Sequence, residues 1–231
     1  NGPRSFPGTY DTISHMLPTL EDPVTRPYVG MLATHQATSV GEMRYLTELA
    51  AGYGLHVWQT EHHLANVGGG GMDAALELAR DLHEGVVLSN VNAYFTWCYA
   101  WIPDEQKTSG LISIPEPPNR DQYTVTKPYY AFKQYSREVR PGSHRVGAIS
   151  HDPRLRVGAF RDAERLILTV INDRSLAIEA SIGIGGSPQL IEVRRTSETE
   201  DYAEAPAFAP HTPASAAVTG VSPAAASAPA T

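Results

Sequence analysis

The part of the sequence before Gly142 alternates between short apolar runs and amphipathic stretches, and this alternation constrains the fold more than any other feature. The apolar runs carry almost no charge, as parallel strands buried on both faces would. The stretches between them space apolar residues three and four positions apart, which predicts helices. In chain order we expect helix 11–17 limited by Pro18, strand 28–34, helix 39–52, strand 55–60, helix 72–82, strand 91–98 and helix 129–139. Such alternation predicts a parallel sheet with crossover helices, an α/β fold.

Several boundaries of these elements have their own signals. Ser39 and Glu42 have the spacing of a capping box, so a helix is expected to begin there. Gly52 can end that helix. A polar loop with four prolines follows strand 91–98, and the dipeptide 141–142 (Pro-Gly) ends the last helix.

The pattern changes after Gly142, where short strand candidates follow one another with turn signals between them. The expected strands are 145–149, 155–160, 166–172, 178–184 and 189–194. They predict an antiparallel β module. From Ala203 the sequence is rich in Ala, Pro, Ser and Thr, which predicts a disordered tail. We therefore expect three parts: 1–141 (α/β), 142–202 (all-β) and 203–231 (tail).

Composition excludes several classes of function. The net charge of −7 argues against a nucleic-acid partner, because such proteins usually present a basic face. One cysteine, Cys98, permits no intrachain disulfide. The longest apolar stretch, 93–102, is too short to cross a bilayer. Residues 1–10 lack the pattern of a signal peptide and Asn1 is not Met, so we expect the chain to be part of a longer product.

The strongest chemical signal is a predicted strand, 55–60, that runs directly into the carboxylate of Glu61 and then into a glycine-rich loop. Catalytic residues of α/β barrels lie at the carboxyl ends of strands. A carboxylate flanked there by aromatic residues suits the nucleophile of a glycosidase, which faces an oxocarbenium-like transition state. The alternative is a helix-capping or solvent-facing glutamate.

The second signal is aromatic. Residues 92–101 read NAYFTWCYAW, and tryptophans at strand ends often form platforms for the C–H faces of sugars. The alternative is an aromatic cluster in the core. His35 ends strand 28–34 and either hydrogen-bonds a substrate hydroxyl, orients the carboxylate or has a purely structural role.

Other chemistries fit the residues less well. Glu61, His62 and His63 are adjacent on a strand, so they point to opposite faces and do not converge on a metal ion. The glycines at 68–71 precede a helix but lack the Gly-Lys-Ser/Thr of a phosphate loop. The consecutive Ser, His and Asp at 150–152 cannot form a catalytic triad by themselves and indicate a turn.

In this order, four segments of the sequence resemble glycoside hydrolase family 30, a clan A family of retaining enzymes. They are 28–36 (YVGMLATHQ), 57–61 (VWQTE), 91–97 (VNAYFTW) and 127–145 (KPYYAFKQYSREVRPGSHR). The last is the most specific, with the lysine, paired tyrosines and Arg-Pro-Gly found where the family's chain leaves its barrel. Segment 155–172 resembles strands of the β-sandwich that follows. The resemblance spans roughly residues 1–200.

The resemblance implies a (β/α)8 TIM barrel with an antiparallel β-sandwich, of which this chain is the C-terminal half, with barrel strands six to eight. Glu61 matches the nucleophile, Trp97 the tryptophan beneath the reactive sugar and His35 the histidine near the nucleophile. Further substrate contacts are expected from Trp58, His62, Tyr99 and Trp101. No metal and no cofactor are implied, and the family implies secretion.

Three departures qualify what the resemblance implies. The family's acid/base glutamate lies upstream of Asn1, in the N-terminal half of the barrel, so the chain alone is expected to be inactive. Ala37 stands where the family often has Tyr. Segment 102–126 lacks the Tyr/Arg pattern that recognises glucuronic acid.

The resemblance leaves the substrate and one alternative function open. We expect a glycosidase acting on a β-linked polysaccharide. Xylan is the first candidate, with β-1,6-glucan, β-1,6-galactan and glucosylceramide as the others. The alternatives are a non-catalytic carbohydrate-binding protein and an unrelated α/β domain with a β module.

Overall fold

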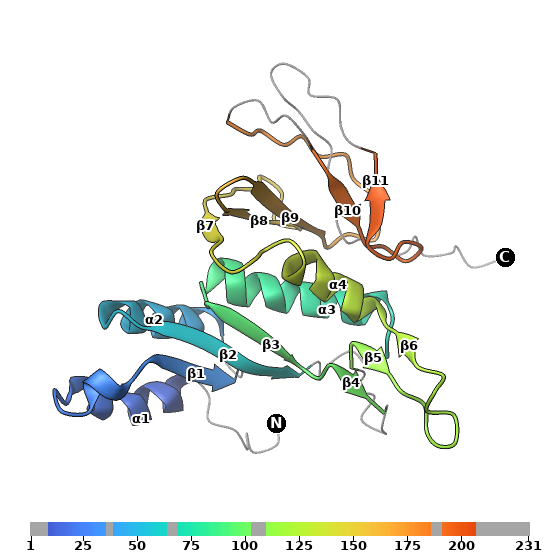
Figure 1. Cartoon of the computed structure of the whole chain (residues 1–231). Coiled ribbons are helices and arrows are strands. Elements are labelled where there is room, and N and C mark those ends of the chain that lie inside the picture. Colours follow the sequence, from blue (N-terminus) through green and yellow to red (C-terminus); the bar gives the residue numbers. More distant parts are fainter. Residues whose placement is uncertain (1–8, 36–38, 64–68, 103–109, 186–190, 207–231) are drawn as a thin grey trace. The chain divides into compact units, whose positions relative to one another are not determined.

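The computed structural model describes residues 9–35, 39–63, 69–102, 110–185 and 191–206 (Figure 1). The chain divides into two compact units. The first comprises Asn1–Leu64 and Asp81–Tyr99, and the second comprises Ala65–Arg80 and Ala100–Thr231. Each unit contains β-sheet of its own. No helix in the described residues is long and apolar enough to span a bilayer.

The first unit is built on a three-stranded parallel sheet in the order β1-β2-β3 (Figure 1). Its strands are β1 (Met31–His35), β2 (His56–His63) and β3 (Ala93–Trp97). The parallel pairing predicted from the alternation is confirmed. β1 begins later than expected, because Arg26–Tyr28 forms a short 3-10 helix that contains Pro27.

Helices pack against this sheet to form the core of the first unit. They are α1 (Thr9–Glu21), α2 (Val40–Gly52), the end of α3 (Met72–Leu82) and the π-helical turn η2 (His83–Leu88). The buried core residues are Leu20, Leu32, Met43, Leu46, Ala50, Leu55, Val57 and Val91. The prediction that Pro18 limits the first helix was wrong, because α1 continues to Glu21. Proline removes one helical amide donor, but the burial of Leu20, which is 2% exposed, offsets that loss.

The predicted capping box at the start of α2 is confirmed. The Glu42 amide donates to Ser39 Oγ at 3.4 Å, and the Ser39 amide donates to Glu42 Oε2 at 3.0 Å. These two bonds satisfy two of the amides that the first turn of a helix leaves without partners. α2 is therefore fixed directly after the end of β1.

The second unit contains a small sheet inside the segment expected to be a loop. Its strands are β4 (Ala100–Trp101), β5 (Ile112–Ser113) and β6 (Thr124–Val125). Helix α4 (Lys127–Ser136) follows, so it begins and ends earlier than the predicted 129–139. Ala131 of α4 packs with Met72, Ala75, Leu76 and Ala79 of α3 and with Ile171.

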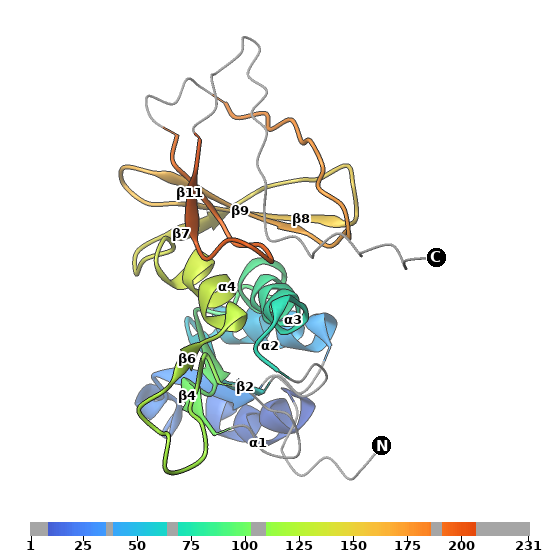
Figure 2. The same cartoon turned by 90° about the vertical axis from the view of Figure 1, so that its right-hand side faces the viewer.

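The rest of the second unit is antiparallel β structure, as predicted (Figure 2). One sheet has the order β7-β8-β9, and β10 pairs with β11. These strands are β7 (His144–Val146), β8 (Leu155–Arg161), β9 (Leu166–Asn172), β10 (Val193–Arg195) and β11 (Ala203–Ala205).

Two predictions for this region were wrong, and others stay predictions. Residues 178–184 form no strand. The tail predicted from Ala203 begins with a strand instead, because Ala203–Ala205 pairs with β10. Residues 207–231 lie outside the described residues. The boundaries predicted at residues 141 and 202 remain predictions.

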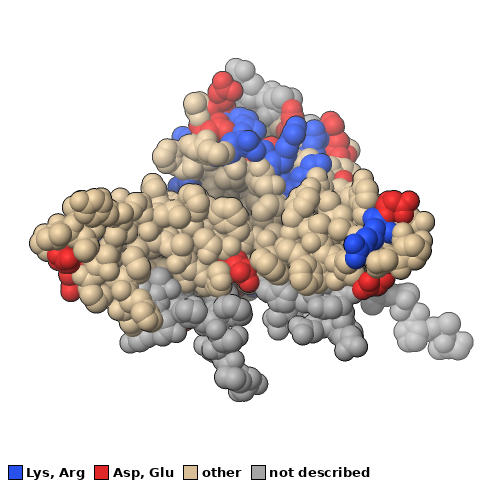
Figure 3. Space-filling model, turned by 60° about the horizontal axis from the view of Figure 1, so that its bottom comes forward, with Lys and Arg blue, Asp and Glu red and all other residues tan. Residues whose placement is uncertain are grey.

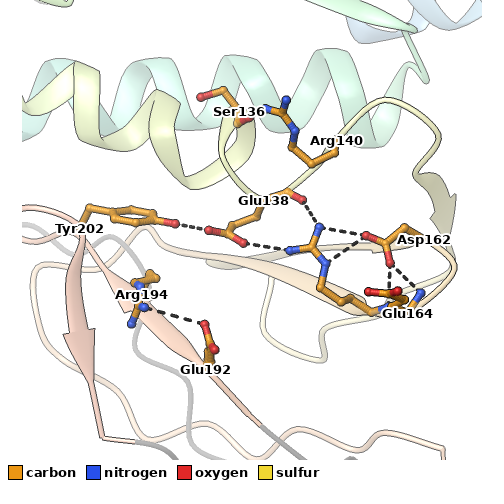
Figure 4. Close-up of polar contacts among 9 residues, drawn as sticks. Ser136, Glu138, Arg140, Asp162, Glu164, Glu192, Arg194 and Tyr202 are labelled. Atoms are coloured by element: carbon orange, nitrogen blue, oxygen red, sulfur yellow. Dashed lines mark hydrogen bonds and ion pairs between the residues drawn. The ribbon is translucent and has the colours of Figure 1, made fainter.

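A polar network joins the end of α4 to the strands (Figure 4). Arg165 donates to Asp162 Oδ2 at 2.9 Å, and a second nitrogen lies 3.5 Å from Glu138 Oε2. The Tyr202 hydroxyl donates to the other oxygen of Glu138. Partial burial raises the pKa of Tyr202, and this hydrogen bond raises it further. The carboxylate of Glu138 thus binds both Arg165, in the β8–β9 turn, and Tyr202, in the segment before β11.

The capping box provides a first test of the fold. Replacing Ser39 by Ala removes the oxygen that accepts the Glu42 amide, so we expect the free energy of unfolding to fall by about 1 kcal/mol. Urea unfolding followed by circular dichroism measures this change. Ser136→Ala, an exposed serine in the last turn of α4, is the matched control and should cost nothing. Equal stability of the two variants would contradict the capping role.

Candidate active site

The two faces of the sheet in the first unit differ in burial. Leu32 and Val57 point to the helices and are each 1% exposed. Side chains alternate along a strand, so Trp58 and its neighbours point the other way. On that second face Trp58, Phe95 and Trp97 are 36%, 47% and 45% exposed. One face is therefore core, and the other presents aromatic side chains.

An irregularity near the end of β2 decides where Glu61 points. Thr34 is paired with Gln59, but the next residue, His35, is paired with Glu61. Thr60 is therefore an extra residue, a β-bulge. Simple alternation from Val57 and Gln59 would turn Glu61 toward the helices. The bulge places it in register with His35, on the face with the exposed aromatic residues.

Glu61 and His35 meet at this end of the sheet. His35 Nε2 lies 3.3 Å from Glu61 Oε2, and the two side chains are 35% and 30% exposed. Thr60 Oγ1 lies 3.3 Å from His35 Nδ1 and donates to the Thr34 carbonyl at 3.2 Å. The imidazole is thus held at both nitrogens beside a carboxylate that stays accessible. The structure brings together two of the predicted site residues, whose catalytic roles remain predictions.

His62 lies elsewhere, which does not favour its predicted contact with substrate. It is the next residue after Glu61 and points to the helix side of the sheet, where its Nε2 lies 2.8 Å from Asp81 Oδ2 of α3. Its ring packs 5.9 Å from the ring of Tyr94. Burial, and then the charges of Asp81 and Glu84, raise the pKa of Tyr94, so its hydroxyl stays neutral. This is a buried polar cluster behind the sheet.

The aromatic residues near Glu61 only partly match those predicted. Trp58 and Phe95 are neighbours on β2 and β3, with ring centroids 5.8 Å apart. Phe95 was not singled out from the sequence, although its position two residues before Trp97 indicates the same face. Tyr99 is 63% exposed at the end of the first unit. Trp101 lies on β4 in the second unit, so its place relative to Glu61 stays open.

Over most of the face drawn in Figure 3 the exposed side chains are uncharged, and Lys and Arg lie in more than one group. Among the described residues, no three His, Cys, Asp or Glu side chains lie close enough together to hold a metal ion. The chemistry that these residues offer is that of an oriented carboxylate beside aromatic rings.

Comparison with known proteins supports this interpretation. No family model matches the chain. The glucuronoxylanase XynC of Bacillus subtilis (strain 168) is 24% identical over 166 residues, which cover 70% of this chain and 36% of XynC. The structure of a family 30 subfamily 8 xylanase from Clostridium acetobutylicum matches with a TM-score of 0.67 and 25% identity, over 84% of this chain and 46% of that one. The chain resembles glycoside hydrolase family 30.

The resemblance to family 30 predicted from the sequence is thereby confirmed, over most of this chain but less than half the length of these relatives. The structure of an endo-β-1,6-glucanase also matches, with a TM-score of 0.60 and 18% identity, over 72% of this chain and 39% of that one. At that identity the match shows a shared fold alone. The names of these relatives describe glycan-cleaving enzymes: two xylanases and a β-1,6-glucanase.

The hydroxyl of Thr60 provides a test of the site geometry. Thr60→Val keeps the shape of the side chain but removes the contacts with the Thr34 carbonyl and His35 Nδ1. We expect the free energy of unfolding to fall by about 1 kcal/mol, the net value of one hydrogen bond. We also expect the imidazole signals of His35 in ¹H–¹⁵N spectra to shift. Thr124→Val, at an exposed threonine of β6, is the control, and unchanged His35 signals in Thr60→Val would contradict the contact.

Proposed function

We propose that this chain carries the nucleophile of a retaining O-glycosyl hydrolase of family 30 type that cleaves a β-linked polysaccharide. One observation carries the proposal. Glu61 lies at the carboxyl end of β2, turned to the face with the exposed aromatic residues, with His35 3.3 Å away. Carboxylates at this end of parallel strands serve catalysis in α/β barrels, and aromatic rings suit the apolar faces of sugars.

The proposed architecture is the C-terminal half of a (β/α)8 TIM barrel at 1–141, followed by a β-sandwich at 142–202. In it, β1, β2 and β3 are barrel strands six, seven and eight. The exposed face with Trp58, Phe95 and Trp97 would point into the barrel, where inward-facing side chains form a packed core. Strands of the N-terminal half would cover the part of this face below the strand ends and leave Trp97, the last residue of β3, open to the substrate.

The proposed mechanism is double displacement. Glu61 attacks the anomeric carbon while a carboxylic acid from the N-terminal half protonates the leaving oxygen. Water then hydrolyses the glycosyl-enzyme, with the second carboxylate as base. In retaining enzymes the two carboxyl groups lie roughly 5–5.5 Å apart. This proposed mechanism requires no metal ion and no cofactor. His35 would orient Glu61, and Trp97 would lie beneath the reactive sugar.

Xylan is the substrate we propose first, since the relatives include a glucuronoxylanase and a xylanase. The segment 102–126 lacks the Tyr/Arg pattern for glucuronic acid, so we propose unsubstituted stretches of xylan. β-1,6-Glucan, β-1,6-galactan and glucosylceramide are the other substrates to assay. A polysaccharide is too large to cross a membrane, so we propose that the enzyme acts outside the cell.

The central test replaces Glu61 by Gln in the complete enzyme, with its N-terminal half. We expect hydrolysis to fall by several orders of magnitude, because an amide cannot act as the covalent nucleophile. Glu48→Gln, at an exposed glutamate on α2 whose side chain is 62% exposed, is the matched control and should keep full activity. Reducing-sugar assays on the four candidate substrates measure both variants.

Two other outcomes would each reject part of the proposal. Equal activity of Glu61→Gln and the unmodified enzyme would show that Glu61 is not the nucleophile. Sugar binding without hydrolysis in the unmodified enzyme would favour a non-catalytic carbohydrate-binding protein, for which the exposed aromatic residues are the supporting observation.

The 231-residue chain by itself should be inactive and prone to aggregate. In the proposed scheme the acid/base carboxyl group comes from the N-terminal half of the barrel, and the parallel sheet exposes aromatic side chains on one face. Among the described residues, the outer edges of β1 and β3 have no strand partner. Light scattering and the same hydrolysis assays check this on the purified chain. Hydrolysis by a monodisperse, monomeric preparation would contradict the prediction.

A further inference from the structure

The bulge in β2 also interrupts the pairing of β2 with β3. Gln59 is paired with Tyr94, and the next paired residue of β2, His62, lies opposite Thr96. Thr60 and Glu61 together therefore face the single residue Phe95 across the interruption. A backbone amide that loses its ladder partner at such a point needs another acceptor, because an amide that is shielded from water and unpaired is costly.

The side chain of Gln59 supplies that acceptor. The Phe95 amide donates to Gln59 Oε1 at 3.1 Å. Gln59 is fully buried, with 0% of its surface exposed. The side-chain carbonyl thus replaces the backbone carbonyl that a regular ladder would present to Phe95.

The arrangement carries a cost in stability. Gln59 Nε2 is buried and has no hydrogen-bond partner among the described residues. An unsatisfied buried donor costs about 1–3 kcal/mol. A methionine would fill similar space without that cost, but it would leave the Phe95 amide unpaired. The side-chain carbonyl of Gln59, which accepts the Phe95 amide, is therefore the group that stabilises the bulge.

A second contact fixes the other side of the bulge. His62 is held on the helix side of the sheet by Asp81, at 2.8 Å, and the Thr96 hydroxyl donates to the His62 carbonyl at 3.4 Å. Neighbouring side chains of a strand point to opposite faces. With His62 held toward the helices, Glu61 is directed to the exposed face.

We infer that Gln59 is a positioning residue for Glu61: its buried carbonyl holds the bulge that turns the Glu61 carboxylate toward His35 and the exposed aromatic face. Gln59 touches no substrate in this scheme and acts through the backbone of β2 and β3. The expected effect of Gln59 on kcat rests on the proposed function, whereas its expected effect on the position of Glu61 does not.

The test replaces Gln59 by Met in the complete enzyme. Small displacements of a reacting group cost up to about 100-fold in rate, so we expect kcat to fall roughly 10- to 100-fold while KM stays within about twofold. A loss confined to folding would lower the amount of active enzyme and the unfolding midpoint without moving Glu61. Gln134→Met is the matched control, because Gln134 donates to Thr196 within the second unit. It should keep kcat.

The second measurement needs no activity. The ¹³C chemical shift of the Glu61 carboxyl group, assigned with Glu61→Gln, reports its contact with His35. We expect it to change in Gln59→Met and to stay constant in Gln134→Met. An unchanged Glu61 shift in Gln59→Met overturns the inference, as does an unchanged kcat in an active enzyme. If the unmodified enzyme hydrolyses no glycan, the proposed function fails, and the Glu61 shift alone then supports or rejects the positioning role.

Discussion

The extra residue at Thr60 is the constraint on which the candidate site depends. A strand repeats every two residues, so one inserted residue exchanges the faces of everything after it. The residues before the bulge cannot shift to compensate, because Leu32 and Val57 are anchored in the core. Each such buried side chain contributes about 1.5–3 kcal/mol, and both would leave the core if the register shifted. The core fixes the register, and the bulge then sets the direction of Glu61.

The same arrangement separates structural from chemical residues along one short segment. Gln59 and His62 face the helix side and make buried polar contacts. Glu61, between them in sequence, faces the accessible side with His35. The Glu61 carboxylate stays partly exposed, while Gln59 and His62 are held by buried contacts. Four consecutive residues thus combine a fixed backbone with an accessible carboxylate.

Much of the fold, but not this detail, was predictable from the sequence. The parallel order of β1, β2 and β3 followed from alternating apolar and amphipathic stretches, and the start of α2 followed from the capping box. The proximity of His35 and Glu61 followed from their positions near the carboxyl ends of two neighbouring parallel strands. The strand order, the start of α2 and the proximity of His35 to Glu61 all depend on residue patterns within single elements. Such patterns can be recognised in one sequence.

The features that were missed depend on long-range contacts. A bulge is a mismatch between two strands, so β2 alone does not reveal it. Strands of two residues, such as β4 and β5, are too short to show a period. The burial of Leu20 extends α1 beyond Pro18, and pairing with β10 makes Ala203–Ala205 a strand inside an Ala/Pro-rich stretch.

The division of the chain also separates two kinds of functional information. The residues that orient Glu61, among them His35, Gln59 and Thr60, belong to the first unit. The segment 102–126, which lacks the Tyr/Arg pattern for glucuronic acid, belongs to the second. Under the proposed function, the orientation of Glu61 depends on the registry of β1, β2 and β3 and on the core of the first unit. Recognition of a glucuronic-acid substituent would depend on a segment of the second unit. The proposed reaction and the proposed substrate therefore rest on different parts of the chain.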